Sequence, residues 1–251
     1  MDLSQSLEIV SRSDAGVVRS HNEDSVYCNP ASGLAILADG MGGYNAGEVA
    51  SGMVTTLLGS ELEKILAGPE AQSFTQAGQA QARMTLEAEI ARANGAVYQA
   101  AQSQPQYAGM GTTLVMASFF DDTMLVAHIG DSRLYRLRGE KFEQVTRDHS
   151  LLQEQIDSGL LTPEQARHSQ NKNLVTRAVG VDPEVEAEIH GYGVLPGDIY
   201  LLCSDGLNDM VEDEEIGSTV QMLAANLELA ATQLVDMAND NGGRDNVSVI
   251  L

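Results

Sequence analysis

The stretch TTLVMASFFDDTMLVAHIGDSRLYRL (residues 112–137) contains three short apolar runs in succession, separated by turns that hold Asp or Gly. Runs of this kind, bounded by such turn residues, are typical of β-strands. Because no helix separates them, the pattern favours hairpins and antiparallel sheets over a doubly wound parallel sheet. The three predicted strands are 112–120, 124–129 and 134–137, and others are expected at 25–28, 34–38, 199–203 and 247–251.

Apolar residues at helical spacing occur in two longer segments, 46–66 and 84–101, and a third helix is predicted at 223–238. Grouped strands with a few long helices predict a layered α/β sandwich, with helices outside antiparallel sheets. Residues 68–79 read as a loop between helices. The length of 251 residues suits a single domain over residues 1–251.

The chain is strongly acidic, with 36 Asp and Glu against 14 Lys and Arg and a formal charge of -22. Such a surface repels nucleic acids and anionic membranes, so neither is an expected partner. No apolar run reaches the roughly 18 residues that a membrane helix needs. The two cysteines, Cys28 and Cys203, lie in strand-like runs and no signal segment precedes the fold, which predicts a cytoplasmic protein.

Four aspartates adjoin predicted strands and stand beside glycine or another small residue: Asp39, Asp131, Asp205 and Asp245. Each of them alone fits an ordinary turn. If the four strand ends converge, however, their like charges need a compensating cation. The ligands are hard oxygens, and the five histidines are scattered along the sequence, so Mg²⁺ or Mn²⁺ fits better than zinc or copper.

The glycines after Asp39 match no nucleotide-binding motif. Glu48 stands where a P-loop needs Lys, and Asn45 stands where the dinucleotide fingerprint needs a third Gly. These glycines therefore need another explanation.

Six short motifs together resemble one known family. They are RSHNEDS (19–25), ADGMGG (38–43), GMGTT (109–113), HIGDSRLY (128–135), CSDGL (203–207) and GGRDN (242–246). In this order they resemble the PPM, or PP2C-like, metal-dependent protein serine/threonine phosphatases, in their compact bacterial form. The resemblance covers nearly the whole chain. It implies a four-layer α-β-β-α sandwich, with two antiparallel sheets flanked by helices.

The resemblance also implies a set of metal ligands. Asp39 would bridge two Mg²⁺ or Mn²⁺ ions, and the carbonyl of Gly40 would contact one of them, while the glycines leave room for that approach. Asp205 and Asp245 would hold the other ion. Asp131, with Asp205, would bind a third ion, as in many bacterial members.

Further residues are implied around these ions. Glu23 and Asp24 would lie beside them, mainly through bound waters; the alternative is a polar turn after a strand. Arg19 would clamp the phosphate with two parallel donors, and the alternative is a surface ion pair with a nearby acid. Tyr44 stands where many relatives carry a histidine that donates the leaving-group proton, so it is either a weak donor or a residue that packs at the rim.

The segment 148–173 is expected to be a flap-like insertion, with a helix start at Thr162, Pro163 and Glu164. Many relatives have His followed by Pro in this stretch, whereas this chain has His168 and Ser169. The departure bears on flap conformation and substrate preference, not on the reaction.

The expected function is hydrolysis of phosphoserine and phosphothreonine on proteins by a metal-activated water, without a phosphoenzyme. The partners would be phosphorylated proteins and a cognate bacterial Ser/Thr kinase whose action it reverses, and the chain would be a monomer. One alternative is a non-catalytic binding module of the same fold. Another is a phosphatase dedicated to one anti-sigma-like regulatory partner.

Overall fold

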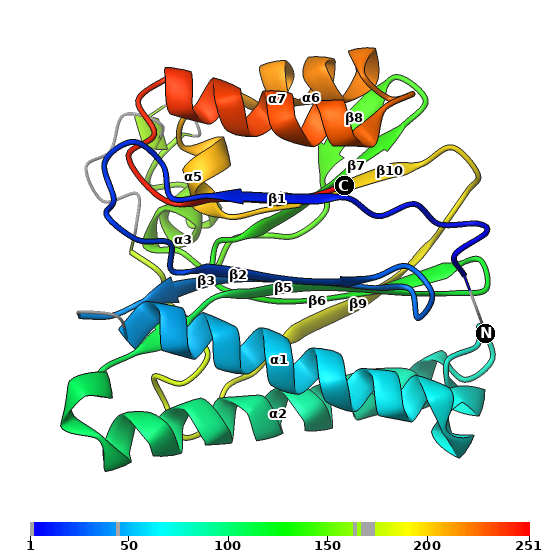
Figure 1. Ribbon diagram of the computed structural model, residues 1–251, viewed down its shortest axis with the longest axis horizontal. Coiled ribbons are helices and arrows are strands. Elements are labelled where there is room, and N and C mark those ends of the chain that lie inside the picture. The colour runs from blue at the N-terminus through cyan, green and yellow to red at the C-terminus, as the bar shows by residue number, and fades with distance from the viewer. Residues whose placement is uncertain (1–2, 44–45, 163–164, 167–173) are drawn as a thin grey trace.

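The computed structural model describes residues 3–43, 46–162, 165–166 and 174–251. In this part of the chain two antiparallel sheets lie face to face, and helices cover both outer faces (Figure 1). The predicted four-layer α-β-β-α sandwich is therefore confirmed. No helix within the described ranges is both long and apolar enough to cross a membrane.

The first sheet has the strand order β2-β3-β5-β6-β9, and β4 pairs with β3. Its strands are β2 (Asp24–Asn29), β3 (Leu34–Met41), β4 (Gly111–Thr112), β5 (Leu114–Phe120), β6 (Thr123–Ile129) and β9 (Glu188–Gly193). The second sheet has the order β1-β11-β10-β7-β8. Its strands are β1 (Ser11–Asp14), β7 (Arg133–Arg138), β8 (Lys141–Gln144), β10 (Ile199–Cys203) and β11 (Val247–Ile250).

Two helices cover each sheet (Figure 1). The first sheet packs against α1 (Ala46–Ala67) and α2 (Gln79–Ser103), and the second against α6 (Asp213–Met222) and α7 (Leu227–Asp240). The short helices α3 (Leu151–Asp157) and α5 (Asp205–Asn208) lie at one end of the sandwich. The predicted loop 68–79 contains a single-turn 3-10 helix (Pro69–Ser73), and a second such helix spans Pro105–Tyr107.

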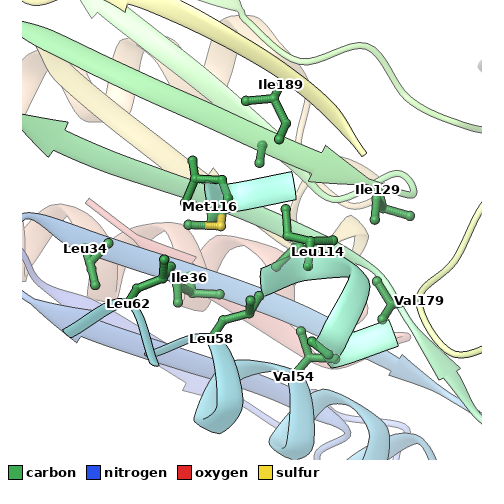
Figure 2. Packing of buried hydrophobic residues seen from close by; sticks show 14 of the residues in the cluster. Leu34, Ile36, Val54, Leu58, Leu62, Leu114, Met116, Ile129, Val179 and Ile189 are labelled. Atoms are coloured by element: carbon green, nitrogen blue, oxygen red, sulfur yellow. The ribbon is translucent and has the colours of Figure 1, made fainter. Parts of the chain in front are cut away.

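The composition of the core follows from two repeats: side chains alternate between the two faces of a strand, and they return to the same face of a helix after about one turn. Alternate residues of β3 face opposite ways, so Leu34 and Ile36 pack under the helices whereas Leu37 packs between the sheets. Helix α1 meets β3 with buried residues one turn apart, among them Leu58 and Leu62 (Figure 2). Each such side chain contributes about 1.5–3 kcal/mol by leaving water.

In the described part of the chain, six strands and α-helices were not expected from the sequence, namely β1, β8, β9, α3, α5 and α6. The three strands are polar or glycine-containing, and β1, β8 and β9 lie at sheet edges, where a strand needs no continuous apolar run. The third helix begins at Leu227 rather than at residue 223, because the Asn226 side chain accepts a hydrogen bond from Leu229 N at 3.0 Å and caps it. The expected helix start at Thr162 is confirmed, because Gln165 N donates to Thr162 Oγ1 at 3.2 Å and Thr162 N donates to Gln165 Oε1 at 2.9 Å. The other two residues of that prediction, Pro163 and Glu164, lie outside the described part of the chain.

The chain crosses from one sheet to the other between β6 and β7. The sequence alone suggests a further hairpin here, but β6 belongs to the first sheet and β7 to the second. Gly130 has a φ of +100°, in the region that favours glycine, and it begins the crossing. Asp131 follows directly, so the crossing places this carboxylate at the end of the sandwich.

Candidate active site

The predicted aspartates come together at one end of the two sheets. The pKa of Asp39 is raised well above its usual range because the carboxyl is buried, and because Asp24, Asp205, Asp131 and Asp245 carry like charges nearby. We call these five residues the aspartate centre. Strand ends that are far apart in the sequence thus meet at one point.

Asp205 lies among the same group of aspartates, and its pKa is raised as well. Burial raises its pKa well above the usual range, and the charges of Asp131 and then Asp209 add to the effect. Asp209 lies just after α5 and was not singled out from the sequence, because it stands inside a short polar turn without a glycine beside it. The negative charge of the centre therefore extends beyond the predicted residues.

Asp24 lies directly opposite Asp39 in the pairing of β2 with β3. One of its carboxylate oxygens accepts a hydrogen bond from Ser204 Oγ at 2.8 Å, but Oδ1 is buried and has no hydrogen-bond partner among the described residues. Burial, as the largest cause, raises the pKa of Asp24 to about 6. Glu23 Oε1 is likewise buried without a hydrogen bond, and His21 Nε2 lies 3.4 Å from it. Buried acceptors left without donors fit a site that takes a divalent cation.

Asp39 is held through its backbone by the GMGTT motif. Its N–H donates to Thr113 Oγ1 at 3.0 Å, and its carbonyl accepts from Thr112 Oγ1 and from Thr113 N, each at 2.8 Å. Thr113 Oγ1 also lies 2.7 Å from Ser132 Oγ, next to Asp131. These two threonines therefore fix Asp39 relative to the sheet crossing, a role that sequence reasoning did not assign to them.

Gly40 lies inside β3 rather than after it, because β4 pairs with Gly40 and Met41 and extends the strand. A Cβ at Gly40 would lie 2.1 Å from the carbonyl oxygen of Gly47 and 2.6 Å from that of Glu23. Glycine is thus required here for the close approach of α1 and β2. Sequence reasoning attributed the glycines to access for a metal ion, and the structure adds this packing requirement.

Asn246 joins the two loops that carry Arg19, Glu23 and Asp245. Its Oδ1 accepts from Glu23 N at 2.8 Å, and its Nδ2 donates to the carbonyls of Ala15 and His21 at 2.9 Å. The side chain has a 4% exposed fraction. Asn246 belongs to the GGRDN motif, but sequence reasoning gave it no role, because its partners lie more than 200 residues away.

Arg19 forms an ion pair with Asp245, with 2.7 Å between Nη2 and Oδ2. This is the contact that the sequence analysis gave as the alternative to a phosphate clamp. The pair raises the pKa of Arg19 and places its half-exposed guanidinium at the edge of the aspartate centre. The clamp itself stays a prediction.

Three sequence-based predictions concern residues outside the described ranges. Tyr44, the candidate proton donor, is one of them, and His168 and Ser169 in the expected flap are the others.

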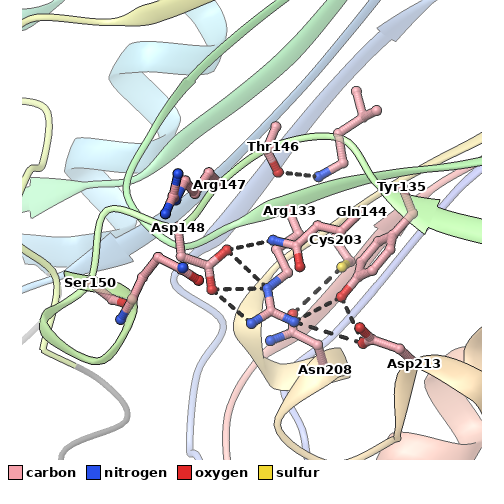
Figure 3. A network of polar contacts seen from close by, with 12 residues as sticks. Arg133, Tyr135, Gln144, Thr146, Arg147, Asp148, Ser150, Cys203, Asn208 and Asp213 are labelled. Carbon is pink, nitrogen blue, oxygen red and sulfur yellow. Dashed lines mark hydrogen bonds and ion pairs between the residues drawn. The ribbon is translucent and has the colours of Figure 1, made fainter. Parts of the chain in front are cut away.

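The start of the segment 148–173 is fixed to the second sheet by a polar network (Figure 3). Arg133 Nε lies 3.0 Å from both carboxylate oxygens of Asp148, and its Nη2 lies 2.7 Å from Oδ2. Its Nη1 donates to Tyr135 Oη at 2.9 Å, and this hydroxyl donates to Asp213. The Arg and Tyr of the HIGDSRLY motif thus anchor this segment.

A cavity of about 370 Å³ lies beside the aspartate centre, between α3 and α5. Asp131 and Asp205 line it on one side, and Gln153 and Ile156 of α3 line it on another. The space is thus open to a substrate that approaches the aspartates.

A second group of titratable residues lies at the edge of the first sheet, with His128 on β6, Glu188 on β9 and His149 in the loop before α3. Among the described residues, only His128, His149 and Glu188 have three His, Cys, Asp or Glu ligand atoms within 4.8 Å of one another. The two imidazole rings stack with centroids 4.7 Å apart. Burial lowers the pKa of both histidines. These histidines look scattered in the sequence, and the structure brings two of them together.

Comparison with known proteins shows the family. The family model for protein phosphatase 2C matches residues 17–239. The serine/threonine protein phosphatase PstP of Mycobacterium tuberculosis is 39% identical over 245 residues, which is 98% of this chain and 44% of that protein. The protein phosphatase PhpP of Streptococcus pneumoniae is 38% identical over 250 residues, 98% of this chain and 96% of that protein.

A solved structure agrees with these matches. The catalytic domain of the serine/threonine protein phosphatase PstP, in complex with two manganese ions, superposes with a TM-score of 0.83. It is 38% identical, and the match covers 97% of this chain and 96% of that one. The chain described here spans less than half the length of PstP itself.

The chain therefore belongs to the protein phosphatase 2C family. Both of these bacterial relatives are named protein phosphatases, and PstP is named a serine/threonine protein phosphatase. The family and the fold that the six motifs indicate are confirmed.

Proposed function

We propose that this chain hydrolyses phosphoserine and phosphothreonine on proteins at the aspartate centre. The observation that carries the proposal is the convergence of five carboxylates, with buried oxygens of Asp24 and of the neighbouring Glu23 that lack hydrogen-bond partners among the described residues. Buried carboxylates that raise one another's pKa resist ionisation together unless cations compensate them. Two Mg²⁺ or Mn²⁺ ions would do so, and the related PstP domain has been crystallised with two manganese ions.

The ligands proposed for these ions are the predicted ones. Asp39 and the carbonyl of Gly40 would hold one ion, and Asp39, Asp205 and Asp245 the other. Glu23 and Asp24 would accept hydrogen bonds from water molecules around the ions, and Asp131 with Asp205 would hold a third ion. When bound, the ions supply a water of lowered pKa for attack on phosphorus and offset charge on the phosphoryl oxygens.

The protein's own groups bind and orient the phosphate. Arg19 donates to Asp245, so its guanidinium points toward the centre. We propose that Arg19 donates instead to two phosphoryl oxygens when substrate binds. The net charge of -22 repels an anionic substrate at long range, so recognition must come from local contacts such as this one. Tyr44 is proposed as donor of the proton to the leaving alkoxide.

Several further properties belong to the same proposal. The substrates would be phosphorylated proteins, and a cognate Ser/Thr kinase would supply them. The chain would act as a cytoplasmic monomer, as one domain whose flap-like segment, near residues 148–173, borders the cavity beside Asp131. A dedicated anti-sigma-like substrate remains distinguishable from a broad range of substrates by profiling phosphopeptides.

Phosphate release from a phosphothreonine peptide tests the proposal. We expect release with Mn²⁺ and none after EDTA, with recovery when Mn²⁺ is restored. Mn²⁺ binding without phosphate release from any phosphopeptide would favour a non-catalytic binding module instead. Release that persists in EDTA would contradict the metal-dependent mechanism.

A further inference from the structure

His149 occupies both backbone hydrogen-bonding groups of Gly130. The backbone N–H of His149 donates to the carbonyl of Gly130 at 2.8 Å, and the N–H of Gly130 donates to the ring Nδ1 of His149 at 3.2 Å. Gly130 is buried and lies just past the end of β6, where the strand ladder no longer supplies partners. Without the imidazole the N–H of Gly130 would be a buried donor without this partner, whereas the backbone N–H of residue 149 would still pair with the carbonyl. The next residue is Asp131.

The hydrogen bond from the Gly130 N–H also determines the tautomer of the His149 ring. Nδ1 accepts, so it carries no proton, and the proton of the neutral imidazole lies on Nε2. Nε2 faces the carboxylate of Glu188 on β9, with 3.3 Å to Oε2. Both ring nitrogens of His149 thus have a defined partner, one on the sheet crossing and one on the edge strand.

The same hydrogen bonds argue against a metal ion among His128, His149 and Glu188. His128 Nε2 lies 2.8 Å from the carbonyl oxygen of Arg147, and this oxygen can only accept, so Nε2 carries the proton. A metal ion bound between the two stacked rings would have to displace the protons of both Nε2 atoms. The group is better explained as a hydrogen-bonded support.

His149 also fixes the base of the segment that follows it. Its carbonyl accepts from Thr176 N at 2.8 Å, and Leu151 N donates to the carbonyl of Leu174 at 2.9 Å. Residues 149–151 therefore pair with residues 174–176 and close the base of the segment. The side chain and the backbone of His149 thus connect the base of this segment to Gly130, the residue that precedes Asp131.

We infer that His149 is a positioning residue for Asp131, and that its unprotonated Nδ1 holds Gly130 so that the Asp131 carboxylate faces Asp205. The inference rests on the proposed role of Asp131 as a ligand of a third ion. It assigns His149 no contact with substrate. The residue acts through the Gly130 peptide.

Two substitutions distinguish the effect of the acceptor at Nδ1 from the effect of the rest of the His149 ring. In His149→Asn the amide oxygen can take the place of Nδ1 and accept from Gly130. In His149→Gln the side-chain amide reaches the place of Nε2, near Glu188, and the acceptor for Gly130 is lost. We expect hydrogen exchange of the Gly130 amide, measured by NMR in the metal-free protein, to stay near the parent rate in His149→Asn and to accelerate about tenfold or more in His149→Gln.

Calorimetric titration with Mn²⁺ gives the second readout. We expect His149→Gln to lower the affinity for the most weakly bound Mn²⁺ about tenfold and to leave the affinities for the other ions unchanged. His149→Asn should retain all of these affinities. Asp131→Asn is the reference variant and should lose the weakest ion. If Asp131→Asn binds Mn²⁺ as the parent does, Asp131 is not a ligand of a third ion. The exchange rate of the Gly130 amide then still shows whether His149 Nδ1 accepts its hydrogen bond.

Two results would overturn the inference. The first is that the Asn and Gln variants behave alike in both measurements, whether like the parent or equally impaired. The second is stoichiometric binding of Zn²⁺ that is lost in both variants and in Glu188→Gln, which would show a metal site at the histidine pair. Circular dichroism of each variant confirms that the comparison is made between folded proteins.

Discussion

Asp24 and Asp39 lie directly opposite one another on β2 and β3, and the charge of Asp24 adds to burial in raising the pKa of the Asp39 carboxyl. A pair of acids in facing positions of two strands costs stability unless something compensates them. The facing acids are therefore an unfavourable feature at this end of the sandwich.

The first prediction concerns pH and stability in EDTA. The pKa of Asp24 is about 6 in the folded protein and about 4 in an unfolded chain. Between these values only the folded state holds the proton, so the free energy of unfolding falls as the pH rises through this window. We expect Asp24→Asn to remove about 2 kcal/mol of that fall, measured by urea unfolding at several pH values. The charge of Asp24 also raises the pKa of Asp39 and Asp205, so its removal lowers their part of the fall as well. Parallel curves for parent and variant would contradict the prediction.

The second prediction concerns Arg19. A charge-assisted hydrogen bond to phosphate contributes about 1.5–3 kcal/mol, so Arg19→Ala should raise KM for a phosphopeptide about tenfold to a hundredfold. The matched control is Arg12→Ala. Arg12 is also a half-exposed arginine in an ion pair, 3.1 Å from Glu228, but it belongs to β1 and its partner to α7. An equal change in both variants would show that Arg19 acts only through a surface ion pair.

The third prediction concerns the leaving-group proton. If Tyr44 donates it, Tyr44→Phe should lower turnover on an alkyl phosphate, whose leaving group needs protonation, more than on p-nitrophenyl phosphate. The ratio of the two rates in steady-state assays is the relevant measure. Equal losses on both substrates would leave the tyrosine as a residue that only packs at the rim.

The fourth prediction concerns Gly40. A Cβ there would meet the carbonyl oxygen of Gly47 at 2.1 Å, so Gly40→Ala must shift α1 or β2 and should cost about 1–3 kcal/mol in thermal unfolding. Gly52, on α1, has open space where a Cβ would lie, and Gly52→Ala should stabilise the protein by about 0.5–1 kcal/mol. A Gly40→Ala protein as stable as the parent would contradict the packing described here.

Much of this architecture is encoded locally and could be predicted. The apolar spacing of α1 and the adjacent strand runs of residues 112–137 indicate the helix layer and the antiparallel sheets, because side-chain burial follows those periods. The aspartates beside small residues indicate the centre. The only sign in the sequence that these aspartates converge is their repeated position beside a predicted strand and a small residue.

The remainder depends on contacts between distant segments. Strand β9 (EIHGYG) has no strand-like composition, and it forms because β6 offers an edge with free backbone groups. The stacking of His128 on His149, and the three hydrogen bonds of Asn246, also require the folded sheets. No local property of these residues indicates their partners.

The most direct test of the metal-dependent aspartate centre is the rate of phosphate release from a phosphothreonine peptide by Asp39→Asn at saturating Mn²⁺. The account predicts a loss of about a thousandfold or more, since metal ions supply several kcal/mol of transition-state stabilisation. The control Asp236→Asn, which changes an exposed acid on α7, should retain the parent rate. A rate for Asp39→Asn close to that of the control would contradict the account.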